Sequence, residues 1–174
     1  MAHISQIDYE TSSPEIRAAF DEETRLRGAP TNMKRTLLHS VPAHKAYMEW
    51  YSLRDVVVPF LGKRAFSVFA YAISSQNDCL LCTTFFRKAL IDQGLSPESF
   101  EPTADEDLLI AFGRAIARHY EGVDPALWER VRARYSETEI VNLVAFAGLM
   151  VATNLFNNVV QVSVDDQLKD YLKA

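Results

Sequence analysis

The stretch Ser74-Ser75-Gln76-Asn77-Asp78-Cys79-Leu80-Leu81-Cys82 contains both cysteines of the chain. Residues three positions apart are neighbours on a helix, with Cβ atoms about 5–6 Å apart, so this pair can switch between dithiol and disulfide after a small adjustment. Two cysteines this close in sequence cannot close a long loop, which excludes the disulfide staple of a secreted fold. In a reducing compartment a C-x-x-C pair is more often redox-active or metal-binding than structural.

The residues around the pair predict two helices joined by a turn. The segment from about Lys63 to Ser75 is apolar nearly all round, which is typical of a helix at the centre of a bundle. We predict that the next helix begins near Asn77 and runs to Gln93, with the cysteines in its first turn. An Asn77 cap would place both sulfurs near unpaired N–H groups and the positive end of the helix dipole, which favours thiolate, whereas Asp78 would oppose it.

Helix start signals recur through the rest of the chain and predict an all-α fold in a single domain, residues 1–174. Apart from the two helices above, we expect helices from Ser13-Pro14 to Gly28, Thr31 to about His39, Pro42 to about Val58, a short turn-like one from Ser96-Pro97, Thr103 to His119, and two that start at Asp124-Pro125 and Ser136. Residues 160–164 alternate between apolar and polar, which predicts a short extended tail packed on a neighbouring subunit.

Length and composition narrow the class of protein. A chain of 174 residues with 48% hydrophobic and 24% charged residues is typical of one globular domain. The 18 basic and 23 acidic residues give a net charge of −5, so we expect neither nucleic acid nor a membrane as a partner. The longest apolar run, Leu143 to Ala152, is shorter than the roughly 20 residues of a membrane span and predicts a buried helix or an oligomer contact. Because the N-terminus has no secretory signal pattern, we expect a cytoplasmic protein.

The string S-x-x-N-x-C-x-x-C, formed by Ser74, Asn77, Cys79 and Cys82, resembles the AhpD-like branch of the carboxymuconolactone decarboxylase family. The resemblance is strongest over about residues 63–94. It implies an AhpD-like helical bundle that assembles as homotrimers or hexamers. It also implies a catalytic dithiol that reduces a hydroperoxide or a partner disulfide, with Cys82 as the attacking thiol and a dithiol such as a lipoyl group as the reductant. No cofactor is expected.

The positions that correspond to the family's relay glutamate and histidine are occupied here by Ser67 and Phe86. Peroxide reduction needs a thiolate and an acid that protonates the departing oxygen. His44 on the preceding helix is a candidate substitute that could reach the site after folding. Arg87 and Lys88 follow the second cysteine, but on an ideal helix they lie off the sulfur face.

Three other hypotheses remain open. The first is a decarboxylase or lactone-processing enzyme that acts on a small anionic substrate, as in the family's other branch. The second is a non-catalytic oligomer that has kept the fold and uses its cysteines for sensing or core packing. The third is a zinc site, but the missing ligands lead us to expect no metal, because the four histidines (His3, His39, His44 and His119) are scattered.

Overall fold

The computed structural model describes residues 2–118 and 122–173, and in these ranges the regular structure is helical with no β-strand. This confirms the predicted all-α class. The elements in chain order are α1 (Pro14–Arg27), α2 (Asn32–Leu37), α3 (Val41–Leu61), α4 (Lys63–Gln76), α5 (Leu80–Ile91), α6 (Ala104–Arg118), α7 (Pro125–Arg134), α8 (Glu137–Val160) and a 3-10 helix η1 (Asp166–Tyr171).

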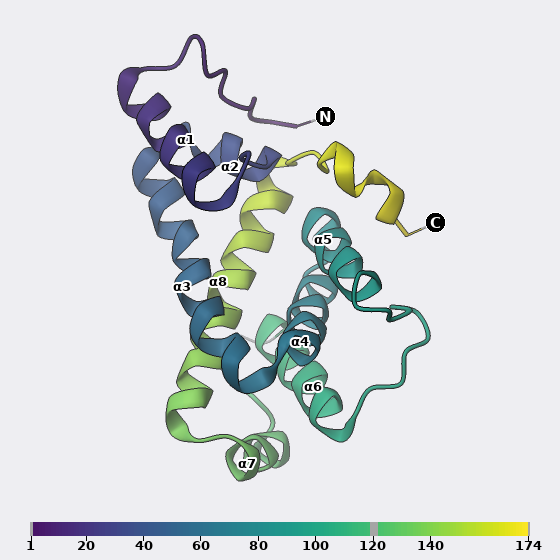
Figure 1. Ribbon diagram of the computed structural model, residues 1–174. Helices are drawn as coiled ribbons and strands as arrows, with labels where there is room; N and C mark the ends of the chain where they lie inside the picture. Colours follow the sequence, from purple (N-terminus) through teal and green to yellow (C-terminus); the bar gives the residue numbers. More distant parts are fainter. Residues whose placement is uncertain (1, 119–121, 174) are drawn as a thin grey trace.

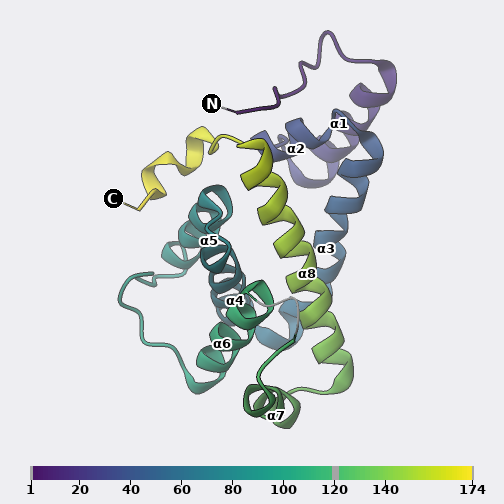
Figure 2. The same cartoon turned by 180° about the vertical axis from the view of Figure 1, so that it is seen from behind.

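Helix α4 lies at the centre of the bundle, as its apolar sequence predicts. It packs against α5 and α6 on one side and against α3 and α8 on the other. Figure 1 shows the long helices α3 and α8 side by side, with α4, α5 and α6 as a second group, and Figure 2 shows the same two groups from behind. The centre of the core holds Phe69, Phe112 and Phe146, all fully buried. Gly113 permits the close approach of α6 to α4, because a Cβ there would lie 3.0 Å from Phe69.

Local capping chemistry sets most of the helix starts, as predicted. The side chains of Ser13, Thr31 and Asp124 accept backbone N–H groups at the first turns of α1, α2 and α7. Ser136 and Glu139 form a capping box at the start of α8, in which each side chain bonds the other residue's backbone N–H.

The structure corrects two predictions, one at the end of α3 and one in the segment between α5 and α6. Helix α3 continues past Pro59 to Leu61 and ends at Gly62, which has a positive φ of 80°. Pro59 is exposed in the last turn, so the lost backbone hydrogen bond falls on the solvent side, where water can replace it. Ser96 opens a turn and not a helix: Phe100 N–H bonds to Ser96 O, but Pro102 keeps the preceding residue out of the helical region. The predicted helix end at His119 lies outside the described residues.

Helix α8 is long and apolar enough to cross a membrane by length and composition. It packs against α3, α4 and α6, and its side chains Leu143, Phe146 and Met150 are buried in the core. We therefore interpret α8 as a core helix of this bundle.

Candidate active site

The turn between α4 and α5 places the two cysteines. Asn77 ends α4, and Asp78 reverses the chain direction with a left-handed φ of 50°. Cys79 is the N-cap of α5, and its Sγ accepts the backbone N–H of Cys82 at 3.5 Å. The prediction that α5 begins near Asn77 is therefore wrong, because the left-handed residue separates Asn77 from the helix and leaves a sulfur in the capping position.

Asn77 instead ties the turn to two other helices. Its Nδ2 donates to Ala117 O on α6 at 3.0 Å, and its Oδ1 accepts Nδ2 of Asn154 on α8 at 3.1 Å. Its backbone carbonyl accepts Nδ2 of Asn158 at 2.9 Å. Ser74 is fully buried one turn earlier, and its carbonyl accepts Cys79 N–H at 3.2 Å. The side chain of Asn77 and the backbone carbonyl of Ser74 thus fix the backbone from which the cysteines project.

Both cysteines are free thiols, and both are buried. Nδ2 of Asn157 on α8 donates to Cys82 Sγ at 3.2 Å. Val162 and Val164, in the extended tail after α8, pack against the cysteines. The predicted tail, residues 160–164, is shorter than expected, because Val160 still belongs to α8 and the left-handed Gln161 then turns the chain. Val162 and Val164, predicted to pack on a neighbouring subunit, pack against the cysteines of their own chain. The 3-10 helix η1 then packs on α5 (Figure 1).

The two thiols differ in acidity because each one changes the pKa of the other. A hydrogen bond from the Cys82 thiol lowers the pKa of Cys79, and the backbone N–H groups at the helix start add to this against the opposing effect of burial. The pKa of Cys82 is raised well above its usual range, because its thiol donates to Cys79, because it is buried and because a Cys79 thiolate would repel a second charge. The first thiolate of the pair therefore forms at Cys79, and the proton of Cys82 points toward it.

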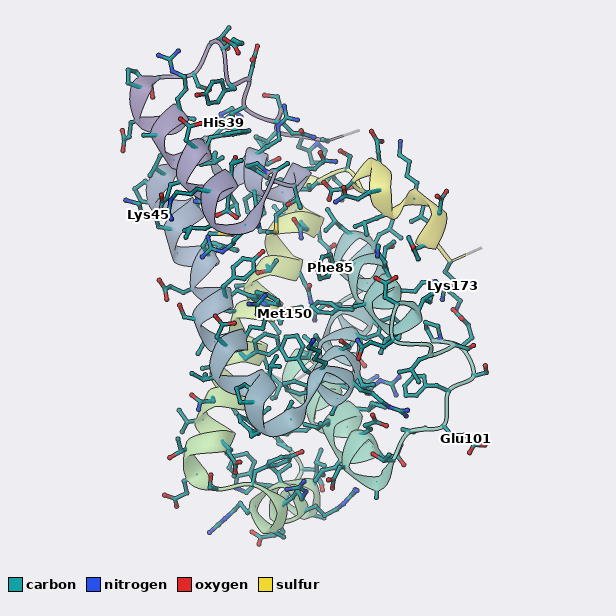
Figure 3. The ribbon with its side chains drawn as sticks, in the orientation of Figure 1. His39, Lys45, Phe85, Glu101, Met150 and Lys173 are labelled. Carbon is teal, nitrogen blue, oxygen red and sulfur yellow. The ribbon has the colours of Figure 1, made fainter. Side chains whose placement is uncertain are left out.

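Cys82 lies on the wall of a small, partly open cavity of about 100 Å³, whereas Cys79 does not reach it. The wall is mainly apolar and is formed in large part by Tyr47, Met48, Trp50, Phe85, Phe86 and Met150. Figure 3 labels two of the lining residues, Phe85 on α5 and Met150 on α8. The side chains in the lining that carry a hydroxyl or a charged group are Thr31, Lys34, Tyr47, Tyr51, Thr153 and Asp165.

The predicted neighbours of the cysteines divide into two groups. Phe86 lines the cavity and packs against Trp50 with ring centroids 6.4 Å apart. Ser67 does not line it, since its hydroxyl donates to Lys63 O at 3.0 Å and accepts Gln93 Nε2 at 2.9 Å. The two positions that hold the family's relay groups therefore bring no acid to the sulfurs here.

His44 also stays outside the cavity wall. It is buried, its Nε2 lies 3.4 Å from Oε2 of Glu23, and burial lowers its pKa in spite of that carboxylate. Arg87 forms an ion pair with Glu98, and Lys88 forms one with Asp92. The prediction that these two cations lie off the sulfur face is consistent with these partners.

The sequence analysis missed a buried polar cluster next to the cavity. Glu23 on α1 is 1% exposed and binds Lys34 Nζ at 2.6 Å and Arg27 Nη1 at 2.7 Å. Lys34 Nζ also donates to the hydroxyl of Tyr51 on α3 at 2.8 Å. No local spacing indicates this cluster, because its members come from three helices. Across residues 2–118 and 122–173, no three His, Cys, Asp or Glu side chains are grouped so as to hold a metal ion.

The fold and the site together define a class: an all-α bundle with a C-x-x-C pair at a helix start, behind a buried central helix. The chain has the AhpD-like fold that its motif predicts. No protein-family model and no curated protein matches the sequence.

Three solved structures carry this conclusion. A peroxidase-related protein with an alkylhydroperoxidase AhpD core, from Ralstonia eutropha JMP134, has a TM-score of 0.70 and 18% identity over 96% of this chain and 94% of that chain. A peroxidase-related protein from Silicibacter sp. TM1040 has a TM-score of 0.73 and 16% identity over 94% and 93%. The debrominase Bmp8, as a cysteine-to-alanine variant in complex with 2,3,4-tribromopyrrole, has a TM-score of 0.74 and 14% identity over 97% and 94%.

Proposed function

We propose that the protein is a dithiol peroxidase in which Cys82 attacks a small apolar organic hydroperoxide and Cys79 resolves the product to a disulfide. The observation that carries this proposal is the placement of the pair: Cys82 lies on the wall of an apolar cavity, and Cys79 lies directly behind it. One sulfur can thus meet a substrate while the other receives its proton.

The reaction balances with the two thiols as the electron source. As the Cys82 sulfur bonds to the terminal oxygen of the hydroperoxide, its proton passes to Cys79 and the O–O bond breaks. The departing oxygen is protonated and leaves as an alcohol, while Cys82 becomes a sulfenic acid. The Cys79 thiol then condenses with the sulfenic acid to form the disulfide and water. A second dithiol, for which we propose a lipoyl group, reduces the disulfide by exchange.

The cavity favours an organic hydroperoxide over hydrogen peroxide. Its volume of about 100 Å³ is somewhat below that of the ~150 Å³ apolar cavity known to bind benzene, so it suits the reactive end of a small apolar molecule. Aromatic and methionine side chains would hold such a group by burial, whereas hydrogen peroxide would gain little from them.

The test is oxidation of the fully reduced protein by one equivalent of cumene hydroperoxide, followed by thiol titration and intact mass. We expect the loss of two thiols and two hydrogen masses, with faster oxidation than by hydrogen peroxide. Cys79→Ser should stop at a sulfenic acid that dimedone traps on Cys82, and Cys82→Ser should consume no hydroperoxide. A reduced wild-type protein that keeps both thiols would refute the peroxidase function.

Reductive debromination is a second candidate, favoured by the aromatic lining of the cavity and by the Bmp8 complex with 2,3,4-tribromopyrrole. The same dithiol would supply two electrons, so that a C–Br bond becomes C–H, bromide leaves and the disulfide forms. Incubation of the reduced protein with 2,3,4-tribromopyrrole should then release bromide in proportion to the disulfide formed. Disulfide formation with cumene hydroperoxide but no bromide release would exclude this candidate.

A carboxymuconolactone decarboxylase-like activity has less support. It requires acid–base residues beside a small anion. The cationic side chain in the cavity lining, Lys34, is already held by the Glu23 carboxylate at 2.6 Å. Its ammonium also donates to the Tyr51 hydroxyl at 2.8 Å, so two of its three hydrogen bonds are already made within the protein.

A further inference from the structure

The buried cluster of Glu23, Lys34 and Tyr51 adjoins the same cavity as Cys82. Lys34 comes from α2, Tyr51 from α3 and Cys82 from α5, and all three line the cavity. Lys34 and Glu23 are 5% and 1% exposed, so the fold keeps an ammonium and a carboxylate away from water at this point. Buried charges of this kind are costly, and they concentrate at functional sites.

The cluster carries an excess of positive charge next to the phenol. Glu23 supplies one negative charge and binds two cations, Lys34 at 2.6 Å and Arg27 at 2.7 Å. Burial lowers the pKa of His44, which also faces Glu23, so this imidazole is kept neutral. The Arg27 guanidinium lies 4.2 Å from the centre of the Tyr51 ring, and that of Arg54 lies 5.1 Å from it.

The direction of the hydrogen bond between Lys34 and Tyr51 leaves the Tyr51 proton available for transfer. An ammonium can only donate, so Lys34 donates to the Tyr51 oxygen at 2.8 Å and leaves the phenol proton free to bond elsewhere. Tyr51 lines the cavity that Cys82 also lines. When the proton leaves, Lys34 remains next to the oxygen and balances its negative charge.

We propose that Tyr51 is the proton donor to the departing oxygen of the substrate, with Lys34 and Glu23 as its positioning residues. This inference rests on the proposed peroxidase function. As the Cys82 sulfur bonds to the terminal oxygen and the O–O bond breaks, the departing oxygen takes the electron pair and the Tyr51 proton, and it leaves as an alcohol. The phenolate stays next to Lys34 and regains a proton from solvent at the mouth of the cavity. Tyr51 thus supplies the acid that Ser67 and Phe86 do not.

Tyr47 and Asp165 are the rival donors, because both line the same cavity. The Lys34 ammonium bonds the hydroxyl of Tyr51 and not that of Tyr47. Burial raises the pKa of Asp165. Its Oδ1 accepts the backbone N–H of Asn32 at 2.7 Å, so it caps the start of α2. We assign it this structural role. The variant Asp165→Asn keeps an oxygen for that hydrogen bond and tests the assignment.

The test uses two oxidants that differ in the group that leaves. Cumene hydroperoxide releases a strongly basic alkoxide that needs a proton, whereas perbenzoic acid releases a carboxylate that does not. Tyr51→Phe removes the proton and keeps the ring. We expect it to slow oxidation of Cys82 by cumene hydroperoxide about 100-fold and to leave oxidation by perbenzoic acid within about twofold of wild type.

Two further variants complete the test. Lys34→Met should also slow oxidation by cumene hydroperoxide more than oxidation by perbenzoic acid, but to a smaller degree; we call this difference between the oxidants the split. The variant leaves Glu23 paired with Arg27. Asp165→Asn should not show it. Equal rates for Tyr51→Phe and wild type with cumene hydroperoxide, equal slowing with both oxidants, or a split with Asp165→Asn would each overturn the assignment to Tyr51. A wild-type protein that reacts with neither oxidant would instead refute the peroxidase function itself.

Discussion

The side-chain amide of Asn157 on α8 donates to the sulfur of Cys82 on α5 across 3.2 Å. Asn157 is 3% exposed, so this bond lies in the protein interior, where a hydrogen bond to a charged sulfur is strong. This hydrogen bond lowers the pKa of both thiols, and for Cys82 it opposes the larger influences that raise the pKa. The acidity of the dithiol therefore depends on a residue far from the cysteine motif in sequence.

Replacing Asn157 by Leu should raise the pKa of both cysteine thiols, because it removes a donor that stabilises either thiolate. A hydrogen bond to a charged group is worth about 1.5–3 kcal/mol, so alkylation by iodoacetamide near neutral pH should slow by about tenfold or more. The pH profile of that rate measures the shift. Asn158→Leu is the matched control, since Asn158 bonds the carbonyl of Asn77 and not a sulfur. An unchanged profile for Asn157→Leu would show that the amide has no role in thiol acidity.

Replacement of Cys82 by Ser and by Ala should separate the effect of the Cys82 hydrogen bond on the pKa of Cys79 from the effect of the backbone N–H groups. A hydrogen bond from Cys82 is the largest cause of the low pKa of Cys79, so Ser, which keeps a donor, should preserve a low pKa and Ala should raise it. In the wild type, one thiolate should form as pH rises through a value below the usual cysteine range, and the second only well above that range. Ultraviolet thiolate absorbance against pH measures both. Identical titrations of the two variants would contradict this account.

Asn77→Ala should destabilise the whole bundle, because Asn77 connects the α4–α5 turn to α6 and α8. Its side chain makes two hydrogen bonds, one to Ala117 O and one from Asn154. Since their loss leaves buried partners unsatisfied, we expect the free energy of unfolding to fall by about 2–3 kcal/mol in chemical denaturation. Asn77→Asp keeps the acceptor oxygen and should lose less. A stability equal to wild type for Asn77→Ala would mean that other contacts fix the turn.

Helix α8 carries an exposed apolar face, defined here as Val141, Val144, Gly148, Leu155 and Val159. Val141, Leu155 and Val159 are 65%, 60% and 62% exposed, and the seven-residue spacing of 141, 148 and 155 is typical of helices that pair with another helix. We predict that the chain forms a homo-oligomer and that this face joins its copies. Leu155→Glu should reduce the mass by light scattering to that of a monomer, whereas Val56→Glu, on an exposed apolar residue of α3, should not. A monomeric wild type would contradict the prediction.

The parts of the fold that the sequence predicts correctly depend on neighbouring residues. The capping box of Ser136 with Glu139 and the apolar residues on nearly all faces of α4 involve residues within one or two helical turns of each other. The sequence pattern therefore predicts them directly. The same holds for the cysteine spacing, which places both sulfurs at one helix start.

The parts that could not be predicted depend on contacts between distant segments. We expected Asn77 to cap α5, but it forms hydrogen bonds with residues of α6 and α8 instead. The sequence near Asn77 does not indicate these distant partners. The cluster around Glu23 consists of residues that look like ordinary surface charges until three helices meet. A charged residue on the inner side of an amphipathic helix is the one available signal, and Glu23 on α1 provides it.

The tail that packs against the cysteines limits the route by which a reductant can reach a disulfide at this site. Val162 and Val164 pack against the pair, and Cys79 is completely buried and does not line the cavity, whereas Cys82 does. A reductant must therefore open a disulfide at Cys82, through the mouth that the oxidant has just left. Oxidant and reductant would then alternate at one opening, which predicts ping-pong kinetics with each of them inhibiting competitively at high concentration. It also predicts that the reductant is slender, such as a lipoyl arm, and not the surface of a folded protein.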